Sequence, residues 1–302
     1  RMVGRSWGWG RRGRRVPAVG QPACVPAVHR PHETAVLVRE EFGSAPVRVA
    51  ELLERGISRQ RVRSAVAAGT LVTVRHGVVQ AAQAADLVEA GSAAQSDPRF
   101  SEDRRAQHLA AARAALLTLA DDCVVSHGSA ALSQRLPTYR APAEDVWVTA
   151  PRHGRIVAGT HRMLGTVEPV DRDIMAGVPV TSVARTALDL ARRRPPHESL
   201  VALDAAAARV GLRELRAAMA RLDWVYDLRR LSEALTLTAS AAESPLESIS
   251  RGWMHECGVV PPLLQEWVTA DDGRRYRVDF LWPDHRVIGE ADGLGKYASI
   301  AD

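Results

Sequence analysis

Residues 275–292 combine an alternating strand pattern with a turn, and no other stretch restricts the fold as strongly. Apolar and polar side chains alternate along 275–282, which is the two-residue period of a strand with one buried face. Residues 283–286, Pro-Asp-His-Arg, have the composition of a tight turn. A second short run follows at 287–292. The stretch therefore predicts an antiparallel hairpin.

The predicted hairpin brings acidic side chains together. With 283–286 as the loop, Asp279 lies directly opposite Glu290, and Arg277 lies opposite Asp292. Opposed side chains have their Cβ atoms about 4.5–5.5 Å apart, so two carboxylates there repel one another unless something compensates. A divalent cation compensates them, and Mg²⁺ binds one or two carboxylates together with waters and a phosphate. Such an ion activates water for phosphodiester cleavage, so the hairpin predicts a Mg²⁺ site at Asp279 and Glu290.

A helix is expected to begin just upstream, at Ser244-Pro245-Leu246-Glu247. Ser as N-cap, Pro at the first helical position and Glu at the third form a capping box. Two interpretations of Glu247 stay open, because the same carboxylate is either a helix cap or an additional ligand for the metal or its water.

The segments "SPLES", "RYRVDFLWPDHRVIGEADG" and "GLGKY" resemble the PD-(D/E)XK nuclease fold, in the branch related to very-short-patch-repair endonucleases, over residues 244–302. The resemblance implies that Asp279 and Glu290 hold the metal and that Glu247 is the helix acid of the catalytic group. Where the fold usually has a lysine, two residues after the glutamate, this sequence has Asp292, and Lys296 follows four residues later. The fold also calls for a further strand and helix, so a chain ending at Asp302 is expected to be incomplete.

A structural alternative for the same acids remains. Asp279 and Glu290 are then edge-strand acids, and Arg277 and Asp292 form a cross-strand ion pair.

Residues 46–82 predict a second unit, a winged helix-turn-helix. Glycine at 56 ends one helix, Ser58 caps the next, and a hairpin at 71–79 follows with His76-Gly77 as its turn. In such a fold the second helix enters the major groove and the hairpin touches the backbone. We therefore expect Arg59, Gln60 and Arg63 to contact double-stranded DNA from the helix, and Arg75 and His76 to contact it from the wing.

Charge supports DNA binding only locally. The chain has a net charge of +5, but residues 1–30 contain seven arginines and no acid, so the basicity of the whole belongs to that segment. Residues 46–80 contain six arginines and two glutamates, which is a local excess of positive charge. The alternative is an arginine-rich helix that is only solvated.

The stretch "RVAELLERGISRQRVRSAVAAGTLVTVRHGVV" resembles the N-terminal winged helix of AbiEi-type antitoxins of type IV toxin–antitoxin systems. "SHGSAALSQRLP" and "GVPVTSVARTALDLAR" resemble the segments that follow it in actinobacterial members, so the likeness covers about residues 46–192. It implies DNA binding, transcriptional autoregulation and a cognate toxin as partner, without catalysis in this half.

The chain as a whole predicts a mixed α/β protein of several units. Apolar runs at 124–125, 146–148, 155–157 and 167–170 alternate with turns, Thr181 is expected to cap a helix through Arg192, and 198–240 is expected to be helical. The expected divisions are a disordered Arg/Gly/Pro-rich tail at 1–45, the winged helix at 46–82, a linker and helix at 83–123, a central α/β and helical domain at 124–243, and the nuclease-like domain at 244–302.

Several classes are disfavoured by composition. No run of 18 apolar residues and no apolar leader is present, so we expect a cytoplasmic protein without a membrane span. Three widely separated cysteines exclude a disulfide framework, and the scattered histidines, including His127 and His161, are expected at surface or hydrogen-bonding positions.

The leading hypothesis is a DNA-binding antitoxin or transcriptional regulator with a metal-dependent endonuclease-like domain. One rival is a non-catalytic regulator with a degenerate nuclease fold. Another is an interaction protein that neutralises a toxin through residues 126–240. The sequence leaves the oligomeric state and the question of catalysis open.

Overall fold

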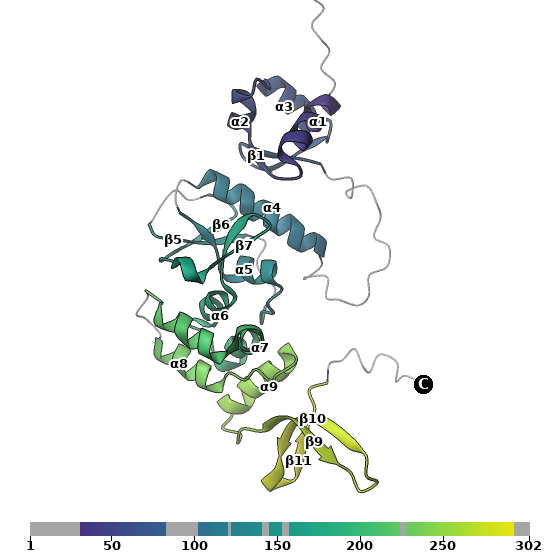
Figure 1. Cartoon of the computed structure of the whole chain (residues 1–302), viewed down its shortest axis with the longest axis vertical. Helices are drawn as coiled ribbons and strands as arrows, with labels where there is room; N and C mark the ends of the chain where they lie inside the picture. The colour runs from purple at the N-terminus through teal and green to yellow at the C-terminus, as the bar shows by residue number, and fades with distance from the viewer. Residues whose placement is uncertain are drawn as a thin grey trace, which may run out of the picture.

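The computed structural model describes residues 31–82, 102–119, 122–140, 145–152, 157–223 and 228–292. The chain has a mixed α/β fold, as the sequence predicts, and the described strands form three separate sheets. Three parts follow one another in Figure 1: a small N-terminal unit, a central sheet with its helices, and a C-terminal helix followed by three strands. Within the described ranges, every helix is too short or too polar to cross a membrane.

The N-terminal unit has the element order of a winged helix-turn-helix. Its elements are α1 (Pro31–Phe42), β1 (Val47–Arg48), α2 (Val49–Glu54), α3 (Arg59–Ala67), β2 (Leu71–Arg75) and β3 (Val78–Ala81). The strands pair antiparallel in the order β1-β3-β2. Buried Val38, Leu52 and Val62 join the three helices in one core.

The predicted boundary of the tail is wrong, because α1 begins at Pro31 and not after residue 45. Thr34, Ala35 and Val38 are buried on one side of α1, which packs against α3 and β3. This helix completes a core that α2 and α3 alone are too short to close. The rest of the predicted tail, residues 1–30, lies outside the described residues.

A five-stranded sheet of order β6-β5-β4-β8-β7 forms the centre of the molecule. Its elements are α4 (Glu102–Thr118), β4 (Val124–Val125), α5 (His127–Gln134), β5 (Val146–Ala150), β6 (Thr160–Leu164), β7 (Arg172–Met175) and β8 (Val178–Thr181). The pairs β4–β8 and β5–β6 are parallel, whereas β4–β5 and β7–β8 are antiparallel. Buried Ala112 and Ala115 of α4 pack against Val148 and Val180 of the sheet.

Two predicted apolar runs differ from the observed strands. The strand paired with β5 begins at Thr160, after the predicted run at 155–157, of which 155 and 156 lie outside the described residues. The run at 167–170 leads into a 3-10 turn, η3 (Pro169–Asp171), because Pro169 removes a backbone donor that a strand needs.

Helices pack below the central sheet in Figure 1. They are α6 (Val183–Ala191), α7 (Pro196–Ala220) and α8 (Leu228–Leu237). The cap of α6 is Ser182, whose side chain accepts a hydrogen bond from the Arg185 amide, and not the predicted Thr181, which ends β8. The long α7 changes direction at Gly211, which has φ 83°.

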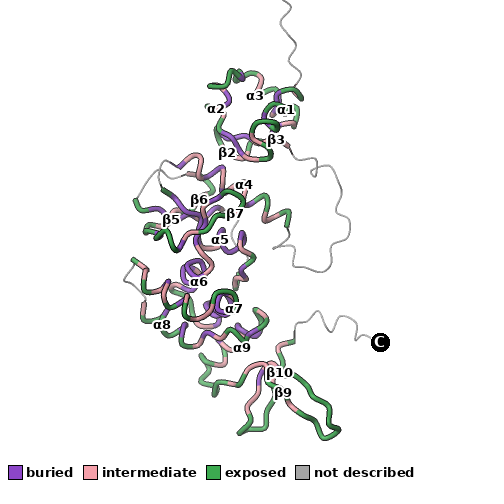
Figure 2. The backbone as a smooth tube through the Cα atoms, in the orientation of Figure 1, coloured by how far each residue is buried: buried purple, intermediate pink, exposed green. Residues whose placement is uncertain are grey.

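The C-terminal unit consists of α9 (Pro245–Glu256), β9 (Leu263–Thr269), β10 (Arg275–Trp282), the 3-10 turn η4 (Pro283–His285) and β11 (Val287–Gly289). Its strands pair antiparallel in the order β11-β10-β9. Helix α9 packs on α7, so the central domain anchors the start of this unit. Figure 2 shows burial concentrated in the central part, whereas the far ends of β9 and β10 are exposed.

Candidate functional site

The outer face of α3 carries three of the predicted DNA-contacting side chains. Arg59, Gln60 and Arg63 are all exposed, while Val62 and Ala65 of the same helix are buried. Ser58 accepts a hydrogen bond from the Arg61 amide at 3.3 Å and so begins the helix where the sequence predicts it. Among the described residues, the three outward side chains make no hydrogen bond or ion pair with the protein. The structure thus brings them together on one open surface.

Two other arginines of this unit are less available. Arg55 pairs with Glu51 at 2.8 Å and with Glu41, and these hydrogen bonds raise its pKa. Arg61 is half-buried. The accessible positive charge is therefore smaller than the arginine count of the sequence indicates, and it lies on α3 and at the exposed Arg48 of β1.

The wing (β2, its turn and β3) contacts the central domain through Arg75. Arg75 Nη2 donates to the carbonyl oxygens of Ala158 at 2.8 Å and Gly159 at 2.7 Å, in the loop before β6. Burial lowers the pKa of Arg75. This guanidinium joins the wing to the central domain, and a DNA contact of Arg75 stays a prediction. His76 is exposed at the tip of the turn.

The C-terminal hairpin has the predicted register. Phe280 pairs with Gly289 and Trp282 with Val287, so the next position along places Asp279 beside Glu290. The two carboxyl groups lie within hydrogen-bonding reach of each other. Partial burial, followed by the charge of Asp279, raises the pKa of Glu290, as expected for two acids that repel.

Glu247 reaches the same place from α9. Its residue is buried, and its Oε2 accepts hydrogen bonds from the Glu243 amide at 3.0 Å and from Gln265 Nε2 at 2.9 Å. Ser244 caps the helix by accepting from the Glu247 amide at 3.2 Å. The carboxylate therefore has the helix-start role that the sequence favours and also faces the acids of the hairpin.

Gln265 connects these acids and was missed by the sequence analysis. Its Nε2 donates both to Glu247 and to Asp279 Oδ1, the latter at 3.1 Å. Gln265 lies within β9 yet has φ 56°, a left-handed value that is strained for a residue with a side chain. The strand pairing skips it, since Val278 pairs with Glu266 and Phe280 with Leu264. Nothing in the local sequence signals this distortion.

The remaining candidate groups surround this cluster. Asp292 is exposed, and the Ala291 amide donates to Asp279 Oδ2 at 2.8 Å. Arg277 pairs with Glu243 of the segment before α9. Lys296 lies outside the described residues. Within those ranges no group of three or more His, Cys, Asp or Glu side chains has metal-binding geometry.

The donor set fits a hard cation held by few protein ligands. Asp279 and Glu290 are adjacent carboxylates, and one of them has a raised pKa, so a cation between them would relieve their repulsion. Mg²⁺ commonly takes one or two carboxylates and completes its octahedron with water. The side-chain amide of Gln265 lies between Glu247 and Asp279. From there Glu247 would bind a water held by the metal more readily than the ion itself.

Comparison with known proteins gives relatives without assigned activity. No family model matches the chain. Two Mycobacterium tuberculosis proteins, uncharacterized protein MT2308 (strain CDC 1551 / Oshkosh) and uncharacterized protein Rv2248 (strain ATCC 25618 / H37Rv), are each 31% identical over 135 residues, which is 42% of this chain and 48% of theirs. The chain thus spans about half the length of the curated relatives it matches.

One solved structure is also similar, the crystal structure of RV2827C protein from Mycobacterium tuberculosis. It aligns with 79% of this chain and 88% of its own at 16% identity, with a TM-score of 0.43. These likenesses assign no function.

Proposed function

We propose that the protein is a DNA-binding regulator of antitoxin type that reads duplex DNA with α3. The observation that carries this proposal is the outer face of α3, where Arg59, Gln60 and Arg63 are exposed and make no bond to the described protein. Arginine suits both phosphates and the guanine edge, and glutamine suits adenine. Arg59 and Arg63 are open to a phosphate or a base, whereas Arg55 nearby is paired with two glutamates. A helix that is only solvated would show the same exposure, so the titration below separates the two interpretations.

The test is a titration of duplex DNA with the full chain at two salt concentrations. Binding through phosphates weakens with salt, with a logarithmic slope of about 0.9 per phosphate neutralised. The Arg59→Ala, Arg63→Ala double variant is expected to weaken binding and to reduce that slope. A matched control is Arg213→Ala, Arg230→Ala, which removes two exposed arginines from α7 and α8. Affinity independent of salt, or equal losses in both double variants, would contradict the proposal.

The acid cluster favours a second, additional activity, Mg²⁺-dependent phosphodiester cleavage. Asp279 and Glu290 would hold the ion, which would supply an activated water and stabilise charge on the phosphate. Asp279 is oriented by Gln265 and by the Ala291 amide, and Glu247 would bind water at the edge of the site. Asp292 occupies the place of a lysine, so a positive group for the phosphate has to come from elsewhere.

This activity is tested by incubating the full chain with supercoiled plasmid and Mg²⁺. Asp279→Asn is expected to abolish nicking, whereas the control Asp284→Asn removes an exposed acid of the turn η4 and leaves nicking unchanged. Calorimetric titration with Mg²⁺ measures the ion independently of cleavage. Duplex binding without Mg²⁺ binding or nicking would support the rival of a regulator with a degenerate nuclease fold. A toxin that co-purifies, in the absence of any DNA affinity, would support the neutralising interaction protein.

A further inference from the structure

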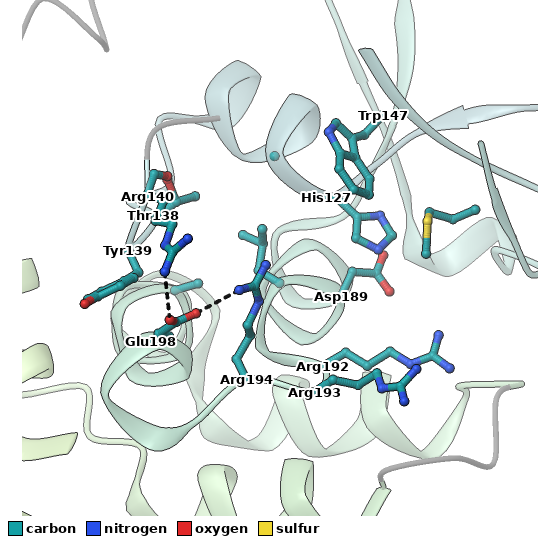
Figure 3. A pocket seen from close by; sticks show the side chains of 14 residues that line it. His127, Thr138, Tyr139, Arg140, Trp147, Asp189, Arg192, Arg193, Arg194 and Glu198 are labelled. Carbon is teal, nitrogen blue, oxygen red and sulfur yellow. Dashed lines mark hydrogen bonds and ion pairs between the residues drawn. The ribbon is translucent and has the colours of Figure 1, made fainter. Parts of the chain in front are cut away.

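A cavity of about 590 Å³ lies where α5, β5, α6 and α7 meet, remote from both sites described above. Ligand pockets generally fall between about 300 and 1,000 Å³, so it suits one small molecule. Figure 3 shows His127, Trp147 and Asp189 grouped on one side of the cavity, and Glu198 between Arg140 and Arg194 on the other. Neither DNA contact nor metal binding uses any of them.

Arginines dominate the charge of the cavity wall. Four of them line it, at positions 140, 192, 193 and 194, against two acids, Asp189 and Glu198. Glu198 is shared between Arg194 at 3.0 Å and Arg140 at 3.8 Å, as the dashed lines of Figure 3 show. The lining therefore carries an excess of positive charge, and guanidinium groups bind phosphate in a bidentate manner.

Asp189 contributes a buried acceptor to the same cavity. Its side chain is only 3% exposed, and its Oδ1 accepts a hydrogen bond from Arg185 Nε at 3.0 Å. Its Oδ2 is buried without a hydrogen-bond partner. A buried unsatisfied acceptor is costly, and a ligand N–H or O–H group reaching this wall would satisfy it.

Aromatic rings form another part of the wall. Trp147 of β5 stacks on His161 with ring centroids 4.5 Å apart and lies 5.4 Å from the ring of His127. Burial lowers the pKa of His127 and so favours its neutral imidazole. Its Nδ1 is hydrogen-bonded to Ser126 Oγ at 2.9 Å, which leaves Nε2 for a ligand. Flat heterocyclic bases stack on such rings.

The backbone at this cavity is held in unfavourable conformations. His127 has φ 51° and Arg193 has φ 60°, both in the left-handed region. Non-glycine residues held there concentrate at ligand sites. His127 belongs to "SHGSAALSQRLP", and Asp189 and Arg192 belong to "GVPVTSVARTALDLAR". The two central segments that the sequence analysis singled out therefore meet here, although the DNA-binding proposal gives them no role.

We propose that this cavity binds a nucleoside phosphate, with the phosphate on Arg192 and Arg193, the base against Trp147, and an N–H or O–H of the ligand on Asp189. The three kinds of contact match the three chemical parts of a nucleotide. A free nucleotide and the 5′-terminal nucleotide of a strand share this chemistry. A volume of about 590 Å³ is suited to one free nucleotide, and the experiment separates the two.

The experiment is calorimetric titration of the full chain with the four nucleoside 5′-monophosphates, with the matching nucleosides and with inorganic phosphate. At least one monophosphate is expected to bind more tightly than its nucleoside and than phosphate. The Arg192→Gln, Arg193→Gln double variant should bind that monophosphate about tenfold or more weakly, as expected for lost charge-assisted hydrogen bonds. The matched control, Arg213→Gln, Arg230→Gln, should leave it unchanged.

A second variant separates ligand binding from folding. Trp147→Leu should weaken the binding of the monophosphate and leave the affinity for inorganic phosphate unchanged. Circular dichroism verifies that this variant and the arginine variant are folded. A short single strand with a 5′-phosphate, titrated into the Arg59→Ala, Arg63→Ala variant, tests the strand end. Tighter binding than the free nucleotide assigns the cavity to strand ends, and weaker binding assigns it to free nucleotides. No nucleotide binding at millimolar concentration, binding no tighter than phosphate, or no loss in the arginine variant overturns the proposal.

Discussion

Gly252 of α9 lies directly on the backbone of His197 at the start of α7. A Cβ at position 252 would stand 2.2 Å from His197 Cα and 2.4 Å from its amide nitrogen. The His197 ring also stacks on Trp253, with centroids 3.9 Å apart, and its Nδ1 is 2.7 Å from Glu256. This contact fixes α9, and with it Glu247, to the central domain.

Gly252→Ala is therefore expected to separate α7 from α9. The added methyl group meets backbone atoms, which do not move aside as a side chain does. The free energy of unfolding should therefore fall by at least the upper part of the range of about 1–3 kcal/mol seen for overpacking. Thermal unfolding followed by circular dichroism measures it. His255→Ala changes an exposed position of the same helix and should cost far less. Equal melting temperatures for wild type and Gly252→Ala would show that the two helices are not in this contact.

Stability is expected to fall as the pH decreases below 6.5, the ordinary pKa of a histidine, in part because of His108. Ser129 Oγ accepts a hydrogen bond from the Trp147 amide at 2.8 Å and is hydrogen-bonded to His108 Nε2 at 2.8 Å. Burial lowers the pKa of His108 from its ordinary value of 6.5. The unfolded chain then binds more protons, and the stability present above that value is lost as the pH falls toward the lowered pKa.

Urea unfolding at several pH values measures this loss, which amounts to about 1.4 kcal/mol for each unit by which the pKa is lowered. His108→Gln keeps a polar group and removes the titration, so its stability should depend less on pH than that of wild type. His255→Gln is the control on an exposed site. A pH dependence that is the same in His108→Gln and in wild type would contradict the prediction.

Arg75→Ala is expected to loosen the wing without removing a DNA contact. Its hydrogen bonds go to Ala158 and Gly159, so the variant should lose about 1 kcal/mol of stability and exchange amide hydrogen faster around 157–159. Duplex affinity should change much less than in Arg59→Ala. A loss of affinity as large as that of Arg59→Ala would return Arg75 to the DNA-binding surface.

Gln265→Glu should make the acid cluster depend on divalent cations. The variant replaces the amide that bridges Glu247 and Asp279 by a third carboxylate of the same shape, which costs about 1–3 kcal/mol through lost hydrogen bonds and added repulsion. Millimolar Mg²⁺ should raise the melting temperature of this variant by more than it raises that of wild type. Glu266→Gln, at the exposed neighbouring position of β9, provides the control. A variant that Mg²⁺ fails to restore would argue against a cation at this place.

Local sequence patterns predicted the structure correctly where a feature depends on a single helix or a single turn. The cap at Ser58 and the apolar spacing of α3 predicted which face of that helix stays in water. The turn at 283–286 fixed the pairing of Phe280 with Gly289 and so the approach of Asp279 to Glu290. In the same way, Ser244 was predicted correctly as the residue that begins α9.

Contacts between distant segments were beyond such patterns. Helix α1 had too weak a periodicity to be separated from the arginine-rich segment before it, and its packing on α3 became visible only in the fold. The same holds for Arg75, whose partners are more than eighty residues away. Gln265 looks like any polar strand residue until its left-handed backbone is seen.

The sequence by itself determined α3, α9, the two hairpins and the side chains that each presents, because hydrogen bonding within an element, caps and turns act over a few residues. Only the tertiary structure decided which of those side chains meet. Glu247 joined the acids of the hairpin, Arg75 came to bind the loop before β6, and His127 came to lie beside Asp189. Burying apolar faces brings together segments that no local period relates.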